Sequence, residues 1–73
     1  MTNGEKLNLT IKDFLNNNFE AKRKLNTIII NLRSQGFNYS QLARLFNKVS
    51  NINLFQFEEI MLELDELSDN GMI

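Results

Sequence analysis

The chain contains no proline and only three glycines, Gly4, Gly36 and Gly71, so very little in it interrupts a helix. Its apolar residues recur at three- and four-residue intervals, which is the period of an amphipathic α-helix. The pattern therefore predicts an all-α fold: a small bundle of three to four helices in a single domain over residues 1–73. We expect flexible ends at about residues 1–8 and 68–73.

The first two expected helices differ in how clearly the sequence marks their ends. Thr10 followed by Asp13 is a capping pattern for a short helix over residues 11–16. Residues 19–35 carry a longer amphipathic stripe, and Gly36 supplies the left-handed residue that ends a helix. The apolar positions expected to face the core are Phe14, Leu15, Ala21, Leu25, Ile28, Ile29 and Leu32.

Two further helices share one start signal, an asparagine followed three residues later by a glutamine. Asn38 with Gln41 starts a helix over residues 39–47, and Asn53 with its own glutamine starts one over residues 54–67. The apolar positions expected to face the core are Tyr39, Leu42, Ala43, Phe46, Leu54, Phe57, Ile60, Met61, Leu64 and Leu67.

A chain of 73 residues buries only roughly 60% of the surface that its unfolded form exposes, so its own core is marginal. No cysteine is present to cross-link the fold, and we therefore expect a homodimer. Four large apolar residues fall outside the core stripes, and we expect them at a dimer or partner interface unless the first helix or the tail covers them. They are Phe19, Ile30, Phe55 and Leu62.

Charge is sorted along the chain, although the formal net charge is only -1. Every charged residue over positions 21–50 is basic, and every charged residue from position 51 onward is acidic. A basic surface next to an acidic one can bind phosphate, bind protein, or pair with a second copy. The basic residues are Lys22, Arg23, Lys24, Arg33, Arg44 and Lys48, and the acidic ones are Glu58, Glu59, Glu63, Asp65, Glu66 and Asp69.

The residue inventory argues against several classes of function. Without histidine or cysteine, imidazole and thiolate metal sites are excluded, and no glycine-rich loop or strand-turn-helix elbow positions a nucleophile. We expect neither an enzyme nor a bound cofactor. The acidic residues lack the spacing of a calcium loop, so they form a solvated face or dock on a basic partner. No signal peptide or membrane span is visible, which predicts a cytoplasmic protein.

The stretch INLRSQGFNYSQLARLFNK, residues 30–48, resembles the first part of the helix-turn-helix units of resolvases, transposases and small plasmid-borne DNA-binding proteins. It covers about a quarter of the chain. Gly36 allows the tight turn, Asn38 caps the next helix, and Ala43 is small where two helices cross. The resemblance implies that the bundle is helix-turn-helix-like and that it contacts duplex DNA. After Asn47 the chain departs from the family, because the following helix is acidic instead of basic.

Two hypotheses for function follow. The first is a DNA-binding or DNA-associated accessory protein of a mobile element, a plasmid or a phage. The second is a protein-interaction module, an inhibitor or assembly factor that uses its acidic C-terminal helix. The basic residues 22–24 are equally compatible with a solvated rim, and residues 30–48 with two packed helices that do not touch DNA. The candidate DNA-binding residues are Lys22, Arg23, Lys24, Asn38, Gln41, Arg44, Lys48, Ser50, Asn51 and Asn53.

Overall fold

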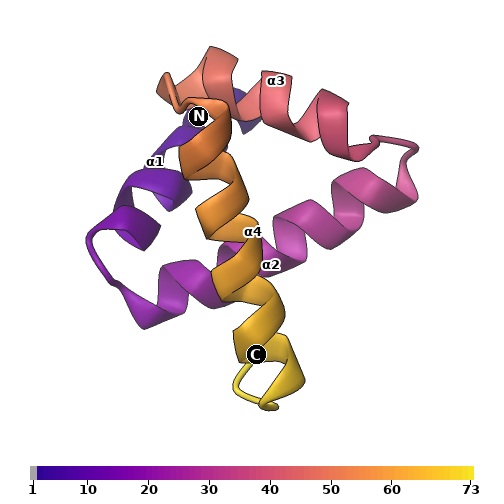
Figure 1. The fold of residues 1–73 in the computed structure, drawn as a ribbon. Helices are drawn as coiled ribbons and strands as arrows, with labels where there is room; N and C mark the ends of the chain where they lie inside the picture. The colour runs from indigo at the N-terminus through magenta and orange to yellow at the C-terminus, as the bar shows by residue number, and fades with distance from the viewer. Residues whose placement is uncertain (1) are drawn as a thin grey trace.

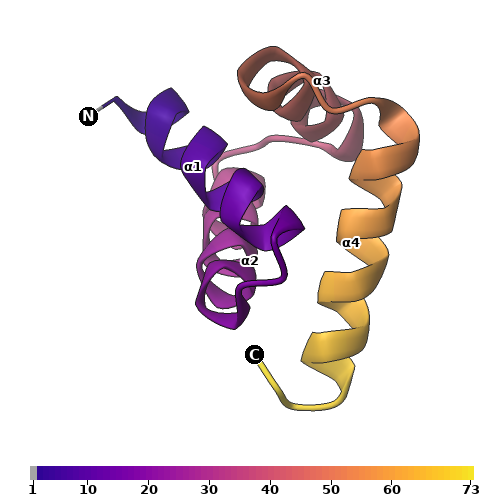
Figure 2. The same cartoon turned by 90° about the vertical axis from the view of Figure 1, so that its left-hand side faces the viewer.

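The computed structural model describes residues 2–73, which form four helices and no strand. They are α1 (Asn3–Leu15), α2 (Phe19–Ser34), α3 (Tyr39–Ser50) and α4 (Leu54–Asp69). In Figure 1, α3 crosses the top of the molecule and α4 runs down in front of α2. Figure 2 shows α1 and α2 on one side and α4 on the other. The predicted all-α bundle is confirmed.

Short polar side chains start all four helices, as the sequence predicted for α3 and α4. The side chains of Asn38 and Asn53 accept hydrogen bonds from the backbone N–H three residues later, and the glutamine at that position accepts one in return. Asn18 caps α2 in the same way, without the return contact. Gly36 follows α2 with φ of 102°, a conformation that costs glycine little. Both α3 and α4 run two or three residues beyond their predicted ends.

The first helix is longer than predicted. It begins at Asn3 instead of Ile11, because Thr2 caps it: the Thr2 hydroxyl oxygen accepts from the Glu5 backbone N–H at 3.2 Å. Thr10 does not start a helix; its hydroxyl donates to the Lys6 carbonyl at 2.8 Å inside α1. Residues 3–8, expected in a flexible end, thus form the first half of α1.

One core joins all four helices, and every buried residue in it is apolar. The aromatic rings of Phe46 and Phe57 meet edge to face, with centroids 5.0 Å apart, and Tyr39 meets the same Phe57 ring at 5.0 Å. The core assignments of Leu15, Leu54 and Tyr39 were wrong, since all three side chains are exposed, although the Tyr39 ring still contacts Phe57. The buried residues are Leu7, Ile11, Phe14, Ala21, Leu25, Ile29, Leu42, Phe46, Ile52, Phe57, Ile60 and Leu64.

The C-terminal end is folded back onto the bundle. Residues 68 and 69 belong to α4, and Gly71 then adopts φ of 70°. The Met72 backbone N–H donates to the Leu67 carbonyl at 2.9 Å, and Ile73 packs partly buried against the core. The expected frayed tail is instead a closed helix end. Among residues 2–73, no helix combines the length and the apolar character needed to cross a bilayer.

Candidate protein-binding face and basic patch

The uncharged polar residues predicted to contact DNA have roles within the fold, at the ends of α3 and at the start of α4. Asn38, Gln41 and Asn53 are engaged in the two capping boxes. The Ser50 hydroxyl donates to Asn8 Oδ1 at 2.7 Å, which ties the end of α3 to α1. Asn51 ends α3 in the left-handed conformation, with φ of 56°. These five residues have a structural reason to be in the sequence that does not involve a ligand.

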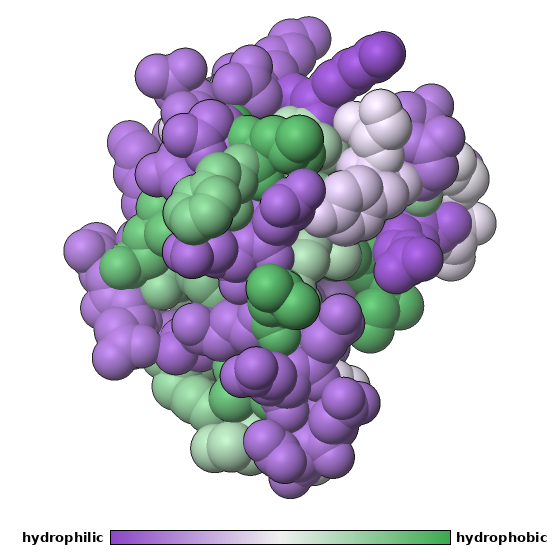
Figure 3. All heavy atoms as spheres, in the orientation of Figure 1, coloured by the Kyte–Doolittle hydropathy of each residue, from purple (hydrophilic) through white to green (hydrophobic). Residues whose placement is uncertain are grey.

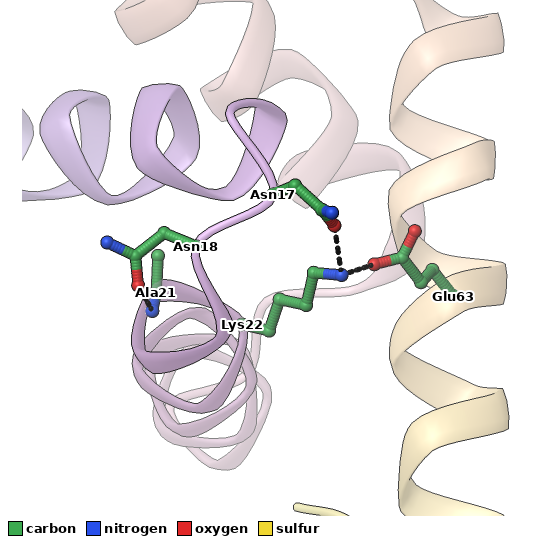
Figure 4. A network of polar contacts seen from close by, with 5 residues as sticks. All are labelled: Asn17, Asn18, Ala21, Lys22 and Glu63. Atoms are coloured by element: carbon green, nitrogen blue, oxygen red, sulfur yellow. Dashed lines mark hydrogen bonds and ion pairs between the residues drawn. The ribbon is translucent and has the colours of Figure 1, made fainter.

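Lys22 is also occupied within the fold. Figure 4 shows its ammonium between Asn17 Oδ1 and Glu63 Oε2, at 2.8 Å from each, so that it joins the α1–α2 connection to α4. It lies 5.8 Å from the centre of the Phe14 ring, and only 13% of its side chain is exposed. Glu63 Oε2 is buried and has no other polar partner in residues 2–73, so the Lys22 ammonium is what offsets the burial of this oxygen. Lys22 therefore contributes to the packing of α4 against the rest of the fold, and its contact with phosphate stays a prediction.

Four of the predicted basic residues remain exposed. Arg23 is 3.9 Å from Glu20 and lies over the Phe19 ring at 5.9 Å. Lys24 lies on α2 near α1. Arg44 and Lys48 lie one turn apart on the side of α3 opposite the buried Leu42 and Phe46, and neither has an acidic residue within ion-pair distance in residues 2–73. We call Arg44 and Lys48 the α3 basic patch.

The four apolar residues predicted to lie off the core are all exposed, in two pairs on two helices. Phe19 and Ile30 lie on α2, and Phe55 and Leu62 lie on α4 with 67% and 63% of their surface exposed. The sequence placed their side chains correctly. Their role at an interface stays a prediction.

The outward side of α4 combines apolar and acidic side chains. Phe55 and Leu62 are seven residues apart, two turns of helix, so they are aligned on the side opposite the buried Phe57, Ile60 and Leu64. Figure 3, drawn with α4 in front, shows separate hydrophobic areas surrounded by hydrophilic ones. We call this surface the α4 outer face. Its residues, all exposed, are Leu54, Phe55, Glu58, Glu59, Leu62, Asp65, Glu66 and Asp69.

The acidic residues of α4 affect the pKa of a tyrosine on α3. The pKa of the Tyr39 phenol is raised above its ordinary value, because partial burial disfavours the phenolate and the nearby Glu58 carboxylate repels it. No group of three or more acidic side chains in residues 2–73 converges closely enough to hold a metal ion. The chemistry of α4 is therefore that of a charged surface.

A groove of about 890 Å³ lies between α1 and α2. It was not predicted from the sequence, because it depends on how these two consecutive helices pack against each other. Leu7, Ala21, Ile28 and Leu45 supply apolar lining. Charged and polar side chains also line it: Lys6, Thr10, Asp13, Glu20, Arg23, Lys24, Thr27 and Asn31. We call this feature the α1–α2 groove.

Comparison of the chain with protein-family models, with curated proteins and with solved structures found no match. The resemblance of residues 30–48 to helix-turn-helix units therefore stays a prediction.

Proposed function

We propose that this chain is a non-catalytic protein-interaction module that binds a basic protein partner through the α4 outer face. The observation that carries the proposal is the exposure of Phe55 and Leu62 on one side of α4, a helix whose charged residues are all acidic. Large apolar side chains exposed together and rimmed by polar groups are typical of protein-binding surfaces.

The charge of the face supports a basic partner. From Leu54 to the end of α4 there are six acidic residues and no basic one. Carboxylates around an apolar centre attract a basic surface and repel an acidic one, which speeds association and selects the partner. The same carboxylates repel the phosphates of DNA, which opposes the use of α4 as a recognition helix.

The test is capture of a partner from an extract of the source organism by immobilised protein. Phe55→Ser with Leu62→Ser removes the apolar centre, and Glu59→Gln with Glu66→Gln removes two charges from the rim. Glu63 is left unchanged because it is paired with Lys22 inside the fold. We expect the first variant to lose the partner and the second to bind it more weakly, with a steeper loss at high salt for the wild type.

The matched control is Leu15→Ser, which removes an apolar side chain at the end of α1 that is also more than half exposed. It is expected to retain the partner. Equal capture by the wild type, the control and both α4 variants would refute the proposal.

A second candidate function, duplex-DNA association, is supported by the α3 basic patch, because Arg44 and Lys48 are exposed and unpaired in residues 2–73. If the patch contacts phosphates, Arg44→Gln with Lys48→Gln should reduce the slope of log affinity against log salt by about 2, since each contact contributes roughly 0.9. Lys12→Gln with Arg33→Gln is the matched control for lost charge. Absence of wild-type binding at low ionic strength would eliminate this candidate.

A further inference from the structure

The α4 outer face and the α1–α2 groove are complementary surfaces on opposite sides of one chain. No α4 residue lines the groove, and Figure 2 shows α1 and α2 on one side of the molecule and α4 on the other. On α2, Lys22 reaches toward α4 whereas Lys24, Ile28 and Asn31 line the groove. One copy therefore cannot place its own α4 outer face in its own groove.

The dimensions of the two surfaces agree. Phe55 and Leu62 are separated by about 10 Å along the helix axis, at 1.5 Å per residue. The part of α2 that lines the groove extends from Glu20 to Asn31, which corresponds to about 16 Å. The groove is thus long enough for both side chains of one α4, over a lining that includes Ile28 and Leu45.

The charges of the two surfaces are also complementary. Lys6 and Lys24 line the groove and have no ion-pair partner in residues 2–73, while Arg23 is held only at 3.9 Å by Glu20. Asp13 and Glu20 are the acidic residues of the groove, so its lining carries one more basic side chain than acidic ones. Over the whole chain, residues 2–53 carry eight basic and three acidic side chains, whereas residues 54–73 carry six acidic side chains and no basic one. This separation orients two approaching copies so that α4 of one meets the α1–α3 side of the other.

We propose that the chain associates with itself head to tail, the α4 outer face of one copy seated in the α1–α2 groove of the next. The use of the α4 outer face rests on the function proposed above. A two-fold pairing of α4 with α4 would instead bring the five carboxylates of each outer face together. Because the two surfaces lie on opposite sides of the chain, a pair of copies still has one free outer face and one free groove. Further copies can therefore add, which gives rings or open chains.

The experiment is sedimentation of the purified full chain at low ionic strength, with two variants that each disable one surface. The groove variant is Lys6→Glu with Lys24→Glu, and the face variant is Phe55→Ser with Leu62→Glu. All four side chains are exposed, and circular dichroism verifies that each variant is folded. A control, Lys12→Glu with Arg33→Glu, makes the same charge change as the groove variant on exposed residues outside the groove.

We expect the wild type and the control to exceed twice the chain mass as concentration rises, and each variant alone to remain a monomer. An equimolar mixture of the two variants should stop at a 1:1 dimer, because one intact groove and one intact outer face remain between them. A groove variant that still dimerises, or a mixture that stays monomeric, would overturn the proposal. A wild type that remains a monomer would also overturn the proposal. If that monomer still captured a basic partner through α4, the function proposed above would stand without self-association.

Discussion

The aromatic contacts of Phe57 should dominate the attachment of α4 to the rest of the bundle. Phe57 is fully buried and meets the rings of Tyr39 and Phe46 edge to face, each at 5.0 Å between centroids. Phe57→Leu keeps an apolar side chain of similar size but removes both ring contacts. Each such contact contributes about 0.5–1.5 kcal/mol beyond burial, so the expected loss in the free energy of unfolding is about 1–3 kcal/mol.

That loss is large for a domain of this length, whose total stability is expected at about 4–11 kcal/mol. Urea denaturation followed by circular dichroism measures it as a lower midpoint with an unchanged slope. Phe55→Leu, the same substitution two residues earlier on the exposed side of α4, is the control and should change stability by less than about 0.5 kcal/mol. Equal midpoints for the two variants would refute the packing described for α4.

Three further predictions concern single contacts. Glu63→Gln should lower the free energy of unfolding, measured by urea denaturation, by about 1 kcal/mol, because it breaks a partly exposed ion pair. In a chain that already carries Lys22→Met, the same change should cause no further loss, and additive losses would contradict the contact. Glu58→Gln should lower the raised pKa of Tyr39 toward 10.0, measured by ultraviolet absorbance because Tyr39 is the sole tyrosine and tryptophan is absent. Since the folded state holds this proton more tightly, wild-type stability should fall as pH rises above 10.0, and less so in Glu58→Gln. Gly36→Ala should lower stability by about 1 kcal/mol, because φ of 102° strains any residue with a Cβ; an unchanged urea midpoint would mean that the turn relaxes.

The sequence predicted the helices whose ends depend on local chemistry. Asparagine caps and Gly36 act within a few residues, so the starts of α3 and α4 and the end of α2 could be predicted directly. The start of α1 was missed although the signal was present: Thr2 and Glu5 form a capping pair, and Leu7, Ile11 and Phe14 follow at helical spacing. The weaker pattern of Thr10 with Asp13 predicted a later start instead.

The roles of several polar residues could not be predicted from the sequence, because they depend on contacts between helices. Lys22 looked like part of a basic cluster, and only the packing of α4 against α2 places Glu63 at 2.8 Å from it. Ser50 and Asn8 are 42 residues apart and meet only in the folded chain. The α4 outer face was more accessible to prediction, since Phe55 and Leu62 lie off the core stripe by periodicity alone.

The most direct test of the α4 outer face is photo-cross-linking from single positions. A photoreactive phenylalanine analogue replaces Leu62 in one protein and Lys12, exposed on α1, in another, and both are irradiated in an extract of the source organism. If the face binds a basic protein, position 62 should give a discrete adduct whose yield falls when Glu59 and Glu66 are changed to Gln, and position 12 should give none. The same adduct from both positions, or none from position 62, would contradict the account.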